Sequence, residues 1–252
     1  MISQRHGPQI GLLVQALVLA CISLTVGLSL SGWIVGMAYG VVMAVGLSRG
    51  LARSGAQRIG PANWVTLTRA TLVGAIAGLV VQSFTVQVSV PMLIGLSTIA
   101  LGLDAADGQV ARRTGSVSEL GARFDMETDA SLILVLSIYV SAEIGWWVLL
   151  IGAARYLFVA AAAIAPWMRR PLPYRPWRKC AAAILGVVLT VAASGVLVER
   201  ANTLLVVAAL AVTVESFGRD IIWLYRRRNQ RLPEWTVDTS DLGFRSIEGQ
   251  GS

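Results

Sequence analysis

Four aspartates stand at helical spacing in or beside two apolar stretches of the sequence. Asp104 and Asp107 are three residues apart in the first stretch, and Asp125 and Asp129 are four apart in the second. On helices, each of these pairs lies on a single face. The polar segment 112–118 separates the two stretches, so the helices can run antiparallel. The spacing therefore predicts that four carboxylates converge in apolar surroundings.

A cluster of this kind needs a counter-charge. An uncompensated charge at the centre of a bilayer costs ~2.5–3.5 kcal/mol on insertion scales, and neighbouring carboxylates also repel one another. Two divalent cations balance four carboxylates, and oxygen ligands suit Mg²⁺ or Mn²⁺, or Ca²⁺ in a loose cage. Two such ions can clamp a phosphoryl group during its displacement. The alternative is a structural cluster in which the acids pair with nearby arginines.

Three small residues accompany the acids. Gly108, Ala111 and Gly121 lie within about a turn of an aspartate, where their lack of bulk lets a ligand approach the backbone. With the acids and Arg112, they form a pattern that resembles the signature of the CDP-alcohol phosphotransferases. The pattern reads Asp104-x-x-Asp107-Gly108-x-x-Ala111-Arg112, then eight residues, then Gly121-x-x-x-Asp125-x-x-x-Asp129. Every position of the signature is filled.

The resemblance implies an integral membrane enzyme with a six-helix core. Such an enzyme transfers a substituted phosphoryl group from a CDP-alcohol to an acceptor alcohol and releases CMP. The resemblance covers about residues 60–228 and is specific only at 104–129. It further implies a homodimer, and it leaves two additional helices in residues 1–60 unexplained.

The resemblance also implies roles for individual residues. Asp129 is expected to act as the general base as well as a metal ligand. The residues expected to bind two divalent cations are Asp104, Asp107, Asp125 and Asp129. Those expected to border the cytidine nucleotide are Gly108, Ala111, Arg112 and Gly121.

A weaker similarity concerns the helix predicted over about 63–81. Asn63, Thr66 and Arg69 share one face of this helix by spacing. Family members often carry a similar series near the nucleotide, so the resemblance implies that these three residues also border it. The alternative is structural: Asn63 caps the helix, and Arg69 extends its guanidinium to the membrane interface.

Two arginines in later apolar segments are candidates for binding the acceptor. Arg155 lies in mid-segment, and Arg219 lies near the end of the last predicted helix. A guanidinium recognises phosphate through paired hydrogen bonds, so both could hold a phosphorylated polyol. Arg219 can instead pair with Glu215 at helical spacing. The basic loop residues Arg175, Arg178 and Lys179 are expected to set topology rather than bind the acceptor.

The composition indicates an integral membrane protein. Of the 252 residues, 55% are hydrophobic and 14% are charged, and the mean hydropathy is +0.67. The net charge of +7 comes almost wholly from arginines between apolar runs, which does not indicate nucleic-acid binding. His6 is the only histidine, which excludes histidine-based catalysis. Cys21 and Cys180, in or beside apolar segments, indicate neither a disulfide nor a zinc site.

Eight apolar segments of near-spanning length are predicted. They cover about 10–30, 33–47, 63–81, 90–112, 116–141, 146–167, 180–198 and 202–225. With eight crossings, the arginine-bearing connections and both termini fall on one side, and the opposite connections contain only Arg200. By the positive-inside rule, the termini and the acid cluster face the cytoplasm, in a cell membrane such as that of a bacterium.

The predicted organisation has three parts. Residues 1–60 form two additional transmembrane helices and a basic connector, 61–228 form the six-helix catalytic domain, and 229–252 form a polar, disordered tail. The first apolar run faintly resembles a lipoprotein signal ending at Cys21. Because the run continues through Cys21 and a second one follows, a retained helix is the better interpretation.

The sequence thus predicts an all-α membrane enzyme, specifically a CDP-diacylglycerol-dependent phosphatidyltransferase of phospholipid synthesis. Its acceptor stays open among glycerol phosphate, inositol or its phosphate, serine and other headgroups. The alternative from another class is a transporter or channel with the acids as a cation or proton path. A cation path does not need the glycine, alanine and arginine residues of the signature. A catalytically silent homologue is the third interpretation, against which the presence of all four acids argues.

Overall fold

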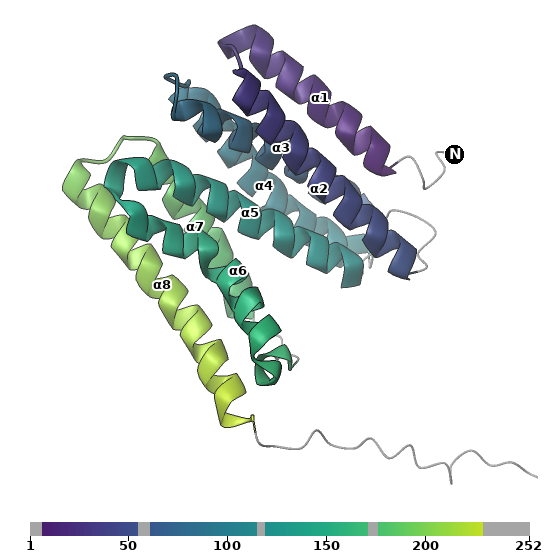
Figure 1. Ribbon diagram of the computed structural model, residues 1–252, viewed down its shortest axis with the longest axis vertical. Coiled ribbons are helices and arrows are strands. Elements are labelled where there is room, and N and C mark those ends of the chain that lie inside the picture. The colour runs from purple at the N-terminus through teal and green to yellow at the C-terminus, as the bar shows by residue number, and fades with distance from the viewer. Residues whose placement is uncertain (1–6, 55–60, 115–118, 171–175, 229–252) are drawn as a thin grey trace, which may run out of the picture.

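The computed structural model describes residues 7–54, 61–114, 119–170 and 176–228. These ranges form eight α-helices and two short 3-10 helices, with no strand among them (Figure 1). The α-helices are α1 (Gly7–Val26), α2 (Leu30–Ser54), α3 (Pro61–Ser83), α4 (Val90–Thr114), α5 (Glu119–Ile144), α6 (Leu149–Ile164), α7 (Pro176–Ala193) and α8 (Glu199–Arg226). The 3-10 helices are η2 (Trp146–Val148) and η3 (Pro166–Arg169). The tail predicted over 229–252 lies outside the described residues.

The all-helical prediction is confirmed, and the differences lie at helix ends. α3 begins at Pro61, so Asn63 lies in the first turn and the prediction that it caps the helix is wrong. α7 likewise begins at Pro176, inside the segment predicted as a loop. Proline favours the first helical position because it lacks only an N–H that would be unsatisfied there. α8 begins at Glu199, so the connection predicted over 199–201 is helical.

Five helical segments are long and apolar enough to cross a membrane. They are Gly7–Val26, Leu30–Ala52, Trp64–Ser83, Trp146–Ile164 and Glu199–Arg226. Within the described residues, the apolar parts of α4 and α7 are shorter. Together with the composition, these segments indicate an integral membrane protein. The count of eight crossings and the cytoplasmic placement of the termini stay predictions.

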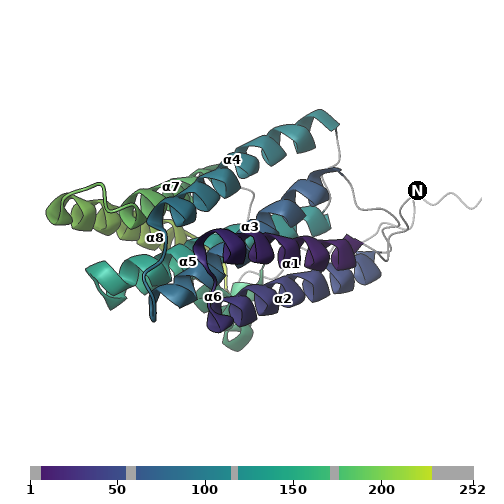
Figure 2. The same cartoon turned by 90° about the horizontal axis from the view of Figure 1, so that it is seen from above.

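α3 lies at the centre of the bundle. About 72% of its apolar window is buried, against 22% for α1, α2 and α8. A helix that is apolar on all sides is buried, and α3 shows no polar face over most of its length. α1 and α2 lie together at one end of the bundle, and α7 and α8 lie at the other (Figures 1 and 2). Most side chains of α3, including that of Arg69, are therefore surrounded by neighbouring helices.

Glycines let α2 approach α3 very closely. A Cβ added at Gly78 would lie 2.8 Å from the carbonyl oxygen of Gly32, and one at Gly36 would lie 3.1 Å from that of Gly74. Small residues four apart allow two membrane helices to touch along their backbones. The contact between Gly32 and Gly78 therefore holds α2 against the central helix.

Replacing Gly78 with leucine is expected to lower the free energy of unfolding by about 1–3 kcal/mol, because overpacking forces the two backbones apart. The measurement is the midpoint of thermal unfolding in detergent. Gly95→Leu on α4 is the matched control, since a Cβ there meets no atom within 4 Å. Equal midpoints for the two variants would contradict the close backbone contact.

Candidate functional site

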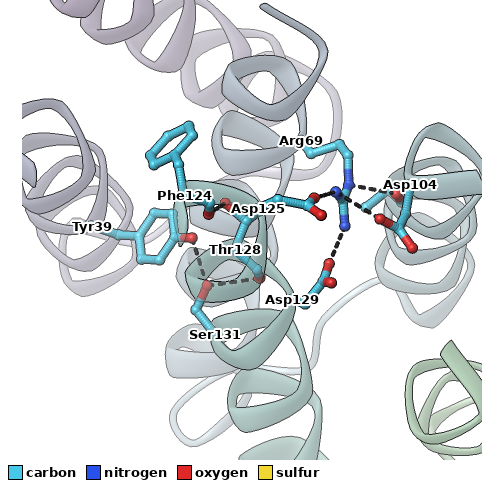
Figure 3. Close-up of polar contacts among 9 residues, drawn as sticks. Tyr39, Arg69, Asp104, Phe124, Asp125, Thr128, Asp129 and Ser131 are labelled. Carbon is cyan, nitrogen blue, oxygen red and sulfur yellow. Dashed lines mark hydrogen bonds and ion pairs between the residues drawn. The ribbon is translucent and has the colours of Figure 1, made fainter. Parts of the chain in front are cut away.

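Three of the four predicted acids converge between α4 and α5. One carboxylate oxygen from each of Asp104, Asp125 and Asp129 lies within 4.8 Å of the other two (Figure 3). The four-residue spacing on α5 places Asp125 and Asp129 on one face, which turns toward Arg69 of α3. Asp107 lies one turn beyond Asp104 on α4, and its side chain is outside the described part of the chain.

The guanidinium of Arg69 lies among these acids. It reaches them from α3, and only 1% of the arginine is exposed. Its Nη1 lies 2.9 Å from Asp104 and 2.5 Å from Asp125, and its Nη2 is paired with Asp129. Its Nε donates a hydrogen bond of 3.3 Å to the carbonyl of Ala100 on α4. Arg69 therefore joins three helices at the acid cluster (Figure 3).

The alternative in which Arg69 reaches the membrane interface is wrong. An arginine extends toward an interface when the hydrocarbon offers it no partner. Here three carboxylates from two neighbouring helices supply partners inside the bundle, so the side chain turns inward. Arginine is suited to this position because its planar fork can donate to several acceptors at once.

The charges of the acid cluster do not balance. Three carboxylates against one guanidinium leave two net negative charges among the described side chains. This excess equals the charge of one divalent cation, and Asp107 would add another negative charge. The donors are all carboxylate oxygens, which is the ligand set that Mg²⁺ and Mn²⁺ prefer. The residues therefore fit a divalent metal ion.

The three acids are partly exposed, whereas some of the residues around them are buried. Asp104, Asp125 and Asp129 keep 31%, 19% and 27% of their side chains exposed, so a ligand can reach them. Thr66 lies one turn before Arg69 and is buried, with 2% exposure. Gly121 lies one turn before Asp125 and is half-buried. The side chains of Asn63, Ala111 and Arg112 and the surroundings of Gly108, also predicted for the nucleotide, are outside the described part of the chain.

A hydrogen-bonded chain supports α5 on the side of α2. The Ser131 hydroxyl donates to the carbonyl of Thr128 over 2.9 Å, and the Tyr39 hydroxyl lies 2.7 Å from Ser131 Oγ (Figure 3). Because the Ser131 proton is used within α5, Tyr39 is the donor to Ser131. This contact from α2 braces α5 next to Asp129. Sequence patterns do not predict this contact, because 92 residues separate the two side chains.

The two arginines predicted for the acceptor pair with glutamates. Arg155 on α6 pairs with Glu127 of α5. Since Glu127 is two residues from Asp129, it lies on the opposite face of α5. Arg219 pairs with Glu215 at the helical spacing that the sequence suggested, and 64% of its side chain is exposed. A role of either arginine in acceptor binding stays a prediction.

Comparison with protein families gives one match. The model of the family described as CDP-alcohol phosphatidyltransferase matches residues 60–215, which is more than half of the chain. The matched segment contains Arg69 and all four aspartates of the signature, and it excludes α1 and α2. No curated protein and no solved structure matches the chain.

Proposed function

Because the chain belongs to the CDP-alcohol phosphatidyltransferase family, we propose that it transfers a phosphatidyl group from CDP-diacylglycerol to an acceptor alcohol and releases CMP. Membership implies transfer of a phosphoryl group from a CDP-alcohol, and the choice of donor is our proposal. The observation that carries the proposal is the convergence of Asp104, Asp125 and Asp129. An apolar bundle has no structural need for this excess of charge.

The proposed metal ligands are the four acids of the signature. Asp104, Asp125 and Asp129 offer converging oxygens, and Asp107 follows one turn later on α4. When bound there, two Mg²⁺ or Mn²⁺ ions would neutralise the diphosphate and stabilise the charge that develops on the transferred group. The role of Arg69 is to hold the carboxylates of two helices in place from the third.

Asp129 is the proposed general base. The acceptor hydroxyl attacks the phosphorus atom that carries the diacylglycerol, the bond to the CMP oxygen breaks, and Asp129 receives the hydroxyl proton. The contact with Arg69 orients its carboxylate. Its 27% exposure lets a hydroxyl approach, whereas Arg69 itself is inaccessible. Thr66 and Arg69 therefore support the wall of the proposed nucleotide site, and Gly108, Ala111, Arg112, Gly121 and Asn63 are its other proposed members.

For the acceptor, we keep Arg155 and Arg219 as proposed contacts. A phosphate group of the acceptor would have to displace Glu127 from Arg155. Changing either residue should therefore change the KM for the acceptor. Glu127→Gln is expected to lower the KM for a phosphorylated acceptor, and Arg155→Gln is expected to raise it about tenfold, with kcat less affected. Steady-state CMP release at varied acceptor concentration measures both. An unchanged KM in both variants would make the pair purely structural.

The test of the proposed function uses the purified full chain with CDP-diacylglycerol, Mg²⁺ or Mn²⁺ and a panel of acceptors. CMP release is quantified and the lipid product is identified by mass spectrometry. Metal-dependent CMP release with one acceptor is the expected result. Cation flux in vesicles without CMP formation would instead support a transporter. We further propose a homodimer with termini and acid cluster on the cytoplasmic side, in a bacterial cell membrane.

A further inference from the structure

A second hollow lies on the other side of α5. It is a cavity of about 860 Å³ between α2, α5 and α6. Glu127 and Ser131 contribute to its wall, and both lie on the face of α5 opposite Asp125 and Asp129. α2 supplies the facing wall and lies outside the segment that matches the family. The cavity therefore lies apart from the acid cluster, on the other face of α5.

One end of the cavity is basic. Arg49 lies near the end of α2 and Arg123 near the start of α5, and both line the cavity. Among the described residues that line the cavity, the one acid is Glu127, and it is paired with Arg155. Arg49 and Arg123 thus bring two guanidinium groups to the same end of the cavity. The basic end is therefore complementary to an anion.

The remainder of the cavity is largely apolar. Val42, Met43 and Leu47 line it from α2, and Leu134 and Val135 line it from α5. From Arg123 to Val135, α5 rises about 18 Å. One leaflet of the hydrocarbon core is about 15 Å deep, half of the ~30 Å core. The dimensions and polarity thus match a molecule with an anionic head and an apolar tail about one leaflet long.

We propose that this cavity binds one anionic phospholipid of the membrane. Its phosphate would lie between Arg49 and Arg123, and one acyl chain would run along the apolar walls toward Val135. Guanidinium groups donate paired hydrogen bonds to phosphate oxygens. A lipid held there would join α2 to α5 beside the Tyr39–Ser131 hydrogen bond. The cavity therefore links the lipid composition of the bilayer to the helix that carries Asp125 and Asp129.

The test measures lipid binding to the purified full chain by native mass spectrometry, with phosphatidylglycerol and phosphatidylcholine as probes. The wild type is expected to retain one phosphatidylglycerol in preference to phosphatidylcholine. Arg49→Gln with Arg123→Gln is expected to weaken phosphatidylglycerol binding at least about tenfold. Gly46→Phe should weaken it similarly, because a Cβ at Gly46 meets no atom within 4 Å and the ring would fill the cavity.

Two controls separate this site from others. Arg200→Gln removes an exposed arginine on α8 and should leave the bound lipid unchanged. Asp129→Asn should also retain it, because the lipid is not the donor at the acid cluster. Thermal unfolding confirms that each variant is folded. Equal phosphatidylglycerol binding by the wild type, the double variant and Gly46→Phe would overturn the proposal. The proposal would also be overturned if the double variant or Gly46→Phe changed from dimer to monomer while keeping its lipid. The cavity would then be filled by a second copy of the chain rather than by a lipid.

Discussion

Asp129→Asn is expected to lower metal-dependent CMP release by at least about a hundredfold while the protein still inserts and folds. A positioned general base contributes about 10²–10⁴ to the rate, and Asp129 is also a proposed metal ligand. Asparagine has nearly the same shape and its amide oxygen can still accept a hydrogen bond from Arg69. The activity loss is therefore expected without a comparable loss of stability.

The measurement is the initial rate of CMP release from CDP-diacylglycerol at saturating Mg²⁺, together with the thermal unfolding midpoint. Glu143→Gln is the matched control, since it makes the same chemical change at an exposed position near the other end of α5. The control should keep wild-type activity. A fully active Asp129→Asn variant would remove both proposed roles of this residue.

Arg69→Gln is expected to cost about 3–5 kcal/mol of stability in metal-free buffer, because it leaves buried carboxylates without their counter-ion. Arg69 is almost fully buried, and its three partners are mostly buried as well. Mg²⁺ should restore part of the loss, since a cation can supply the missing charge. The unfolding midpoint should therefore rise more on addition of Mg²⁺ in the variant than in the wild type.

Arg69→Lys separates charge from geometry. Lysine keeps the positive charge but concentrates it on one nitrogen, so it cannot contact all three acids as the guanidinium does. The stability of the Arg69→Lys variant is expected to lie between those of the wild type and of Arg69→Gln. If Arg69→Gln unfolded at the wild-type midpoint and responded equally to Mg²⁺, the ion-pair cluster would have no stabilising role.

Much of the acid cluster could be predicted from the sequence because it depends on spacing within helices. Asp125 and Asp129 are four apart, and helix geometry alone places them on one face. The short polar segment between the two helices then brings Asp104 opposite them. The eight helices could be predicted for a similar reason, since long apolar runs separated by arginine-bearing connections have few other interpretations.

The contacts between distant segments could not be predicted in this way. Spacing shows which face of α3 carries Arg69, but not which helices pack on that face, and two of its acids lie 56 and 60 residues away. The Tyr39–Ser131 hydrogen bond depends equally on tertiary packing. The contact between Gly32 and Gly78 did have a sequence signal, because glycines stand four residues apart on both helices.

Arg69, at the centre of the bundle, also affects how the helices assemble during insertion into the membrane. During insertion, α4 and α5 bring several like charges into the hydrocarbon before any cytosolic ion need arrive. Arg69, on the helix that precedes them, is synthesised first and can neutralise part of that charge as the helices assemble. The newly made chain can therefore assemble these three helices before the proposed metal ions bind.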